Sequence, residues 1–330
     1  MRKFQKPTNK KFRPKQKPDN RRQPARRSPN HNNRPSTPHY NVTEGEKAFL
    51  AGTPIDPAPR LRLEDGCDEL TMRAMDLITP IGLGQRGLIV APPGSGKTTI
   101  LKHICQAVAK ARPDIKLFCL LIDERPEEVT DFRRSVQADV RWSTSDETHD
   151  HHIATADKLM HEAYDLAGQG QDVFIVIDSL TRLARVHNAE RKSSGRTLSG
   201  GVDAGAMRIP RKIFGSARNI EDGGSLTIIA SILVETGSRM DEVIFEEFKG
   251  TGNMEIVLSR AISNQRIFPA IDLTKSRTRK EELLMETEEL DKVNKMRRAL
   301  IELGTVEATK LLVDQLKKYP TNKEMLGRLK

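Results

Sequence analysis

The segment RGLIVAPPGSGKTT, residues 86–99, constrains the fold of this chain more than any other. An apolar run leads into a glycine-rich turn, and Lys97 and Thr98 then open a helical pattern. In a P-loop the backbone N–H groups of such a turn surround phosphates, the lysine reaches the β and γ oxygens, and the hydroxyl can ligate Mg²⁺. The strict pattern has glycine where Ala91 stands. The motif alone predicts NTP binding, with a chance glycine-rich turn as the alternative.

Apolar runs and helical patterns alternate along the chain, which is typical of an α/β fold with a mainly parallel central sheet covered on both faces. The expected strands are 87–91, 117–122, 173–177, 226–234 and 254–258. The expected helices are 98–111, 154–167, 180–190 and 206–217. A helical C-terminus is expected over about 280–329.

The positive charge of the chain is concentrated at its N-terminus. The net charge is +10, yet residues 1–40 hold thirteen Lys and Arg against one acid, so the remainder carries 42 bases and 44 acids. Residues 1–40 also contain seven prolines and no Leu, Ile or Val, too little apolar surface to fold. We therefore expect a disordered basic tail over 1–45 and a folded domain over 46–330. The tail is expected to bind nucleic-acid phosphates, with a solubilising arm as the alternative.

Membrane and secreted classes are disfavoured by the sequence. No apolar run approaches the roughly 18 residues that a membrane span needs. The basic N-terminus is not followed by the apolar segment of a secretory signal. Cys67, Cys105 and Cys119 have neither disulfide nor metal-ligand spacing. We therefore expect a cytoplasmic protein with no membrane partner.

Two further apolar runs end in acidic residues. VFIVIDS places Asp178 at the end of an expected strand, the Walker B arrangement in which a carboxylate holds Mg²⁺ directly or through water. LIDERP places Asp123, Glu124 and Arg125 at another strand end, where an open α/β sheet binds its ligands. One of these carboxylates could orient and deprotonate an attacking water. A plain strand end and a capped helix start with salt bridges are the respective alternatives.

Six longer phrases point to one family. They are LIDERPEEVTDF, DSLTRLAR, SGGVDAGA, GGSLTIIAS, EEFKGTGNME and RIFPAIDLTKSRTRKEELL. Together they resemble the Rho family of bacterial transcription termination factors, from about residue 60 to the C-terminus. Rotary ATP synthase subunits share the RecA-like core but would not carry this set of phrases.

The resemblance implies a RecA-like P-loop NTPase that forms a ring of six, binds ATP with Mg²⁺ at subunit interfaces and threads RNA through the centre. Glu124 matches the catalytic glutamate, Lys97 and Asp178 match the other catalytic positions, and Thr98 with Asp178 would hold the metal. The remaining nucleotide-contacting matches are Gly82, Leu83, Gly84, Gln85, Arg86, Gly87, Gly94, Ser95, Gly96, Thr99, Arg125 and Phe268. Of these, Phe268 matches an aromatic residue that stacks on adenine.

Two arginines, Arg266 and Arg279, match residues that reach across the subunit interface toward the neighbour's γ-phosphate. Such a cation stabilises charge in a loose transition state and makes hydrolysis depend on contact between subunits. The alternative is a surface ion pair with a neighbouring acid such as Glu281.

Two loops resemble segments that contact RNA in the central channel. The first is RKSSGRTLSGGVD, residues 191–203, and the second follows the run at 226–234. Arg239 stands where the family has lysine, and an arginine can contact phosphate with two N–H groups. Residues assigned to RNA are Arg191, Lys192, Arg196, Gly200, Gly201, Thr236, Gly237, Ser238 and Arg239. Simple flexible connections are the alternative.

The chain departs from the family pattern in two places. The family usually has lysine where Gly94 stands, so one phosphate contact is expected to be missing, which affects the hydrolysis rate more than binding. Family members carry a cold-shock-like RNA-binding barrel before the ATPase domain, and residues 1–60 contain no barrel-strand pattern. We therefore expect the primary RNA-capture site to be absent or replaced by the basic tail.

The resemblance thus implies an RNA-dependent ATPase and helicase that moves along nascent RNA and releases it from RNA polymerase. The second hypothesis, prompted by Gly94 and the missing barrel, is a weakly catalytic or non-catalytic RNA-binding ring. The third is a ring ATPase that acts on proteins, as export ATPases do. It is disfavoured because the two loops resemble those of the Rho family.

Overall fold

The computed structural model describes residues 41–190, 199–203 and 205–328. The chain divides into two units, 1–36 and 37–330, and the fold described below is that of the second. Residues 1–40, the larger part of the basic tail expected over 1–45, lie outside the described residues. So does the segment 191–198, which contains Arg191, Lys192 and Arg196.

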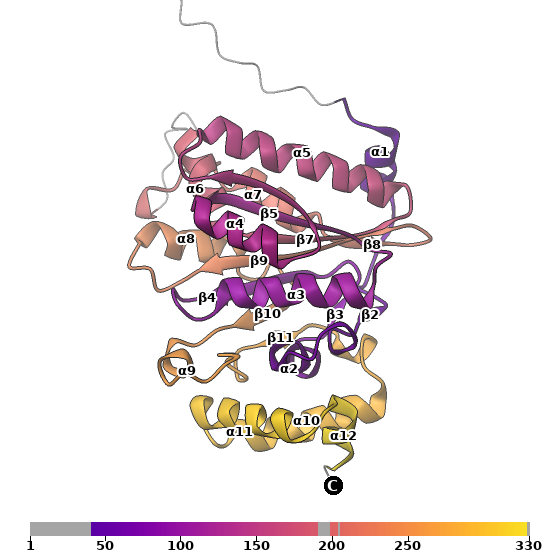
Figure 1. Ribbon diagram of the computed structural model, residues 1–330. Helices are drawn as coiled ribbons and strands as arrows, with labels where there is room; N and C mark the ends of the chain where they lie inside the picture. Colours follow the sequence, from indigo (N-terminus) through magenta and orange to yellow (C-terminus); the bar gives the residue numbers. More distant parts are fainter. Residues whose placement is uncertain (1–40, 191–198, 204, 329–330) are drawn as a thin grey trace, which may run out of the picture. The chain divides into compact units, whose positions relative to one another are not determined.

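A mostly parallel sheet forms the centre of the domain, in the strand order β11-β10-β4-β9-β7-β5-β6 (Figure 1). Its five inner pairings are parallel, whereas β11 pairs antiparallel with β10 and a side branch of β8 and β1 pairs antiparallel with β9. The strands are β1 (Pro54–Ile55), β4 (Arg86–Ala91), β5 (Lys116–Glu124), β6 (Asp139–Thr144), β7 (Asp172–Asp178), β8 (Arg218–Ile220), β9 (Ser225–Leu233), β10 (Met254–Val257) and β11 (Arg277–Thr278). A separate antiparallel pair joins β2 (Arg60–Leu61) to β3 (Ile81–Gly82).

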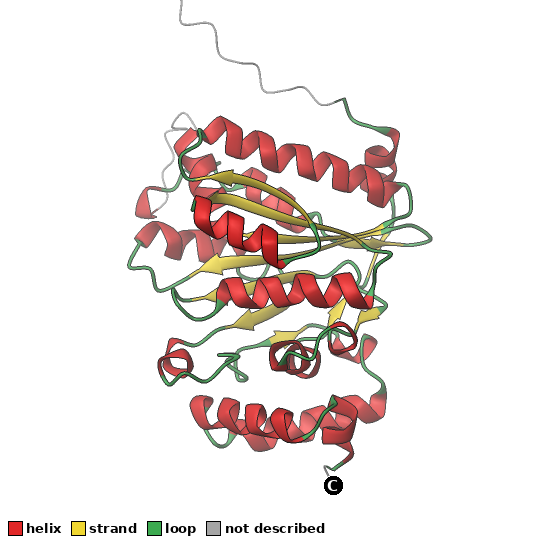
Figure 2. Ribbon diagram, in the orientation of Figure 1, coloured by secondary structure: helices red, strands yellow, loops and turns green. Residues whose placement is uncertain are grey.

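Helices cover both faces of the sheet (Figure 2). One face packs against α2 (Leu70–Ile78), α3 (Lys97–Ala111), α4 (Pro126–Ser135), α10 (Thr287–Ile301), α11 (Thr305–Lys318) and α12 (Asn322–Gly327). The other packs against α1 (Glu44–Ala51), α5 (His149–Gly168), α6 (Leu180–Glu190), α7 (Arg208–Gly215) and α8 (Arg239–Phe248). The short α9 (Arg260–Asn264) follows β10.

The two apolar cores follow from the alternation of side chains along each strand. In β5, Leu117 and Leu121 enter the core on the α3 side, whereas Phe118 and Leu120 enter the core on the α5 side. Because both faces are buried, the strand reads as a continuous apolar run rather than as an alternating one. For this reason the inner strands could be predicted from the sequence.

Two cysteines join the α3 side of this core. Cys105 of α3 and Cys119 of β5 are fully buried, and their sulfur atoms lie 3.3 Å apart. The contact with the Cys105 thiol, followed by burial, raises the pKa of Cys119 well above its usual value. Both thiols therefore pack as small apolar groups at the contact between the helix and the strand.

All five expected strands and four expected helices are present, with shifted ends. The helix expected at 154–167 begins at His149, because the Thr148 side chain accepts a hydrogen bond from the His151 N–H. The helix expected at 206–217 is shorter, Arg208–Gly215. The edge strand β6 was not predicted, since its half-exposed DVRWST sequence contains no apolar run.

The N-terminal part of the described chain begins with α1, which the sequence analysis did not predict. Thr43 caps this helix by accepting a hydrogen bond from the Glu46 N–H. Along the described ranges, no helix is long and apolar enough to cross a bilayer.

The carboxyl ends of β4, β5, β7 and β9 lie at one edge of the sheet, where the arrowheads in Figure 2 point the same way. The phosphate loop follows β4, Glu124 ends β5 and Asp178 ends β7. Parallel topology therefore brings together three motifs that are far apart in the sequence.

Candidate active site

The glycine-rich turn after β4 has the backbone geometry of a phosphate-binding loop. Gly94 and Gly96 have positive φ angles of 77° and 95°, a conformation that glycine adopts without strain. The Ser95 hydroxyl donates to the Pro92 carbonyl at 2.7 Å, which closes the turn. The first turn of α3, from Lys97, directs its backbone N–H groups toward the loop, as anion binding requires. No described atom lies within 4 Å of where a Cβ at Gly94 would be.

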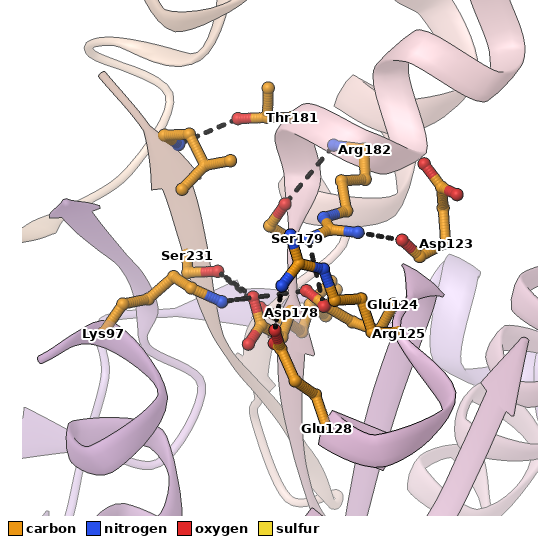
Figure 3. Close-up of polar contacts among 12 residues, drawn as sticks. Lys97, Asp123, Glu124, Arg125, Glu128, Asp178, Ser179, Thr181, Arg182 and Ser231 are labelled. Carbon is orange, nitrogen blue, oxygen red and sulfur yellow. Dashed lines mark hydrogen bonds and ion pairs between the residues drawn. The ribbon is translucent and has the colours of Figure 1, made fainter. Parts of the chain in front are cut away.

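Lys97 and Asp178 meet at the centre of the site (Figure 3). The Lys97 ammonium forms an ion pair and hydrogen bond with Asp178, and it lies 3.8 Å from Glu124. The Ser231 hydroxyl of β9 donates to the same Asp178 oxygen at 2.9 Å. Asp178 is 2 % exposed, so this carboxylate is fixed by charge and hydrogen bonding within the sheet edge.

Glu124 is held differently from Asp178. Its carboxylate is 2 % exposed and lies 3.0 Å from Nη2 of Arg182, which is on α6. Neither Glu124 oxygen has a hydrogen-bond partner of good geometry among the described residues. Arg182 also donates to the carbonyl of Asp123, a residue at φ 55° in the irregular last step of β5. The arrangement leaves a buried carboxylate with acceptor capacity for a water molecule or another donor.

The environment of Glu124 makes it a stronger base than an ordinary glutamate. Burial raises its pKa to about 7, and the neighbouring Asp178 carboxylate acts in the same direction. Lys97 and Arg182 lower the pKa, and Glu128 of α4 raises it slightly. A carboxylate with a pKa near neutrality matches the requirement for a general base.

Helix α6 connects this carboxylate to the second predicted RNA loop. Arg185, one turn after Arg182, pairs through two hydrogen bonds with Asp241, whose carboxylate is 1 % exposed. Asp241 also accepts from the Thr236 hydroxyl at 2.6 Å. The Ser238 side chain in turn accepts from the Asp241 N–H and caps α8. Helix α6 thus contacts Glu124 directly and the loop at residues 236–239 through Asp241.

The described parts of the two predicted RNA loops lie against each other. A Cβ at Gly200 would come within 2.7 Å of the Arg239 carbonyl oxygen, so only glycine fits this contact. Gly200 and Gly201 have positive φ angles of 73° and 77°. The Asn188 side chain at the end of α6 donates to the Gly201 carbonyl at 3.2 Å. Arg239 is exposed and Gly237 has a φ of 75°.

The other residues predicted to contact nucleotide differ in exposure and in position relative to the phosphate loop. The ring of Phe268 is 44 % exposed and would lie 3.8 Å from a Cβ at Gly96, which places it beside the phosphate loop. Arg125 is exposed at the start of α4 and lies 4.0 Å from Glu128. Thr98 is half-buried and Thr99 is exposed in the first turn of α3. Arg266 is exposed with a φ of 59°.

The turn Gly82–Gly87 and Arg279 do not lie beside the phosphate loop, Glu124 and Asp178. The turn leads into the amino end of β4, whereas the phosphate loop leaves its carboxyl end. Gln85 is buried and donates to the Asn253 side chain, and Leu83 and Gly84 are buried too. Arg279 follows β11 and donates its backbone N–H to the Asn253 carbonyl. The turn therefore lies at the opposite end of β4 from its own phosphate loop, and the expectation that it contacts nucleotide stays a prediction.

Similarity to known proteins agrees with the site. The model of the ATP synthase alpha/beta family, nucleotide-binding domain, matches residues 71–278. Transcription termination factor Rho of Haemophilus influenzae is 50% identical over 292 residues, which cover 88% of this chain and 70% of that protein. The chain belongs to the Rho family. Rho of Cereibacter sphaeroides is 52% identical over 282 residues, covering 84% of this chain and 66% of that protein.

Solved structures of other ATPases share the fold of this Rho-family chain. A prototypical ATPase from the type III secretion system of pathogenic bacteria has a TM-score of 0.66 and 26% identity, covering 84% of this chain and 80% of that one. The assembled ATPase EscN of enteropathogenic E. coli also has a TM-score of 0.66, with 25% identity over 85% of this chain and 72% of that one. The predicted α/β P-loop fold is therefore confirmed, and fold and family together identify an ATP-hydrolysing enzyme.

Four site residues of this Rho-family chain were not predicted: Arg182, Arg185, Ser231 and Asp241. The sequence held a partial signal, because DSLTRLAR spaces two arginines three residues apart directly after a strand that ends in a site carboxylate. That spacing puts both on one face of a helix that starts at the active-site edge. Their partners could not be found this way, since they come from other strands and loops.

The pH dependence of hydrolysis should report the pKa of Glu124. Glu124 must be ionised to accept a proton, so kcat/KM for ATP is expected to rise with pH through an acid limb centred near 7, the pKa in the free enzyme. Replacing Arg182 with glutamine removes a cation that lowers this pKa and should move the limb to higher pH. Arg112→Gln, which breaks a pair with the exposed Asp114, is the control. An unmoved limb in Arg182→Gln would contradict the assignment.

Proposed function

We propose that this chain is an RNA-dependent ATPase that assembles into a hexameric ring, translocates along nascent RNA as a helicase and releases it from RNA polymerase. The observation that carries the proposal is the path through α6. Arg182 contacts the buried Glu124, and Arg185 contacts Asp241 under the loop at residues 236–239. A shift of that loop on RNA binding would be transmitted to Glu124 by one helix. The names of the Rho relatives support the same function.

Each residue of the site has a different role in ATP hydrolysis. Lys97 exchanges Asp178 for the β and γ oxygens of ATP, and the N–H groups of the phosphate loop hold the rest of the phosphates. Glu124 accepts the proton of the attacking water, because its two oxygens have no hydrogen-bond partner among the described residues and keep acceptor capacity. Phe268 stacks on adenine beside the loop.

The donor set at the loop fits Mg²⁺. Thr98 offers a hydroxyl and Asp178 a carboxylate, the oxygen ligands that this ion prefers. Within the described ranges no group of three His, Cys, Asp or Glu could hold a metal ion. Bound at the loop, Mg²⁺ would supply charge neutralisation for the phosphates. Thr98 and Asp178 would orient it.

Arg266 and Arg279 are proposed to complete the site from the neighbouring subunit. Arg279 lies at the amino end of the sheet, far from its own phosphate loop, so it acts on a nucleotide only across an interface. Both arginines are exposed. Glu281, the acid named in the alternative of a surface ion pair, lies 3.9 Å from Arg297.

The proposal predicts that RNA stimulates hydrolysis. ATPase rate is measured with and without RNA for the full chain and for a chain lacking residues 1–40, across a salt series. Stimulation of both is expected, and the truncated chain should bind RNA more weakly with a flatter salt dependence if the tail captures RNA. Absence of stimulation by any RNA would favour the non-catalytic ring, and full activity without RNA would favour an ATPase acting on proteins. Unchanged RNA affinity would reduce the tail to a solubilising arm.

A further inference from the structure

Two serine–aspartate pairs join β9 to β7, one at each end of these neighbouring strands. At the amino end, the Ser225 hydroxyl donates to Oδ1 of Asp172 at 2.7 Å. At the carboxyl end, the Ser231 hydroxyl donates to Oδ1 of Asp178 at 2.9 Å. Both serines are fully buried. The chain therefore contains the same contact twice, and only the second lies at the edge that holds the phosphate loop.

Ser231 belongs to the face of β9 that α3 covers. Side chains alternate along a strand, so Ser231 shares a face with Ile229, which packs in the core on the α3 side. Asp178 shares the same face of β7 with Val176. The hydroxyl and the carboxylate therefore meet on the side of the sheet where α3 begins with Lys97. Burial of a hydroxyl is unfavourable unless it is hydrogen-bonded, and the acceptor here is the site carboxylate.

The two oxygens of Asp178 have different surroundings (Figure 3). Oδ1 accepts from both the Lys97 ammonium and the Ser231 hydroxyl, whereas Oδ2 has no hydrogen-bond partner among the described residues. The Ser231 oxygen also lies 3.4 Å from the Ile177 carbonyl oxygen, a longer and weaker contact than the one to Oδ1. Ser231 therefore fixes which oxygen of the carboxylate faces β9 and leaves the other with acceptor capacity.

The contact between Lys97 and Asp178 is lost when nucleotide binds as in the proposed function, because the ammonium then pairs with the β and γ oxygens. Asp178 is 2 % exposed, so bulk water cannot freely replace the lost partner. Ser231 is on β9, which lies between β4 and β7 in the sheet, and its place does not depend on nucleotide. Among the described residues, Ser231 is then the remaining hydrogen-bond donor to Asp178.

We propose that Ser231 is a positioning residue for Asp178, an inference that rests on the Mg²⁺–ATP site of the proposed function. Ser231 holds Oδ1 in place after Lys97 has moved to the phosphates, so that Oδ2 stays available to Mg²⁺ or to a water molecule of that ion. Ser231 does not itself touch nucleotide. Hydrogen-bonded partners of this kind fix the orientation of carboxylate ligands in metal sites.

Cation binding in the nucleotide complex tests this role directly. Mn²⁺, a spectroscopic substitute for Mg²⁺, is titrated against the full chain with a saturating non-hydrolysable ATP analogue, and the free ion is followed by electron paramagnetic resonance. Ser231→Ala is expected to weaken Mn²⁺ binding by about 10–100-fold, the usual effect of losing a hydrogen-bond partner of a metal ligand. Affinity for the analogue in EDTA should stay unchanged, because Ser231 touches neither the loop nor the nucleotide. Ser231→Thr keeps the hydroxyl and should retain most of the Mn²⁺ affinity.

Ser225→Ala is the matched control, because it removes the same kind of hydrogen bond between the same two strands at the opposite edge. The thermal unfolding midpoint of the nucleotide-free chain reports the structural contribution of each bond, and Mn²⁺ binding is measured well below both midpoints. Both alanine variants should lower the midpoint, but only Ser231→Ala should weaken Mn²⁺ binding. A purely structural role of Ser231 predicts equal Mn²⁺ affinity in the two variants, and that result would overturn the proposal.

The outcomes separate this role from the proposed function. Mn²⁺ binding that Ser231→Ala does not weaken would overturn the role of Ser231 and leave the metal site of the proposed function intact. Absence of Mn²⁺ binding to the nucleotide complex of the unchanged chain would overturn both. Weakened Mn²⁺ binding in Ser231→Ala, together with no stimulation of hydrolysis by RNA, would uphold Ser231 and overturn RNA dependence alone.

Discussion

Replacing Glu124 with glutamine is expected to lower kcat for ATP hydrolysis by about 10²–10⁴-fold, the usual contribution of a general base. The amide keeps the size of the side chain but cannot take a proton from water. ATP binding should survive, because the phosphate contacts come from the loop and from Lys97. Steady-state ATPase assays and titration with a fluorescent nucleotide analogue measure the two quantities separately.

Glu128→Gln is the matched control for this substitution. Glu128 is half-buried on α4 and influences Glu124 only weakly through charge. Its replacement should leave kcat within a few-fold of the unchanged chain. Near-normal turnover in Glu124→Gln would remove Glu124 from the role of base.

The second large effect is expected at Lys97. Glutamine there removes the cation that the Asp178 and Glu124 carboxylates share. Loss of one partner of a buried charged contact costs about 2–5 kcal/mol, so ATP affinity should fall roughly 30-fold to 5,000-fold. Without the ammonium the pKa of Glu124 rises further, because Lys97 lowers it in the unchanged chain. Nucleotide titration measures the affinity and thermal unfolding reports the stability of the site.

Lys102→Gln serves as the comparison for Lys97→Gln. Lys102 lies on the same helix and pairs with Asp131, whose side chain is 70% exposed. Exposed pairs contribute at most about 1 kcal/mol, so little change in affinity is expected. Equal losses in both variants would indicate damage to α3 rather than loss of a phosphate contact.

The inner sheet and the phosphate loop could be predicted because their signals are local. A parallel strand buried on both faces is a continuous apolar run, and glycines at positive φ with a lysine after them mark the loop. Glu124 and Asp178 followed from strand ends, since parallel strands bring their carboxyl ends to one edge. The edge strand β6 carried no such signal, because one of its faces is partly exposed.

The contacts between motifs could not be predicted from the sequence. The pairs of Arg182 with Glu124 and of Arg185 with Asp241 join residues more than fifty positions apart. Which acid each arginine meets depends on the packing of α6 against the sheet. The Gly82–Gly87 turn is close to the phosphate loop in sequence, yet the strand between them carries the loop to the opposite edge of the sheet.

The buried contact between Cys105 and Cys119 can be used as a probe of how often α3 separates from β5. One sulfur lies on the helix that begins at the phosphate loop, the other on the strand that ends at Glu124. A thiol reagent can reach this pair only when α3 separates from β5, whereas Cys67 is partly exposed and reports ordinary reactivity. The labelling rate of the pair relative to that of Cys67 therefore measures how often α3 separates from β5. Bound nucleotide that contacts both the phosphate loop and Glu124 should lower this labelling rate.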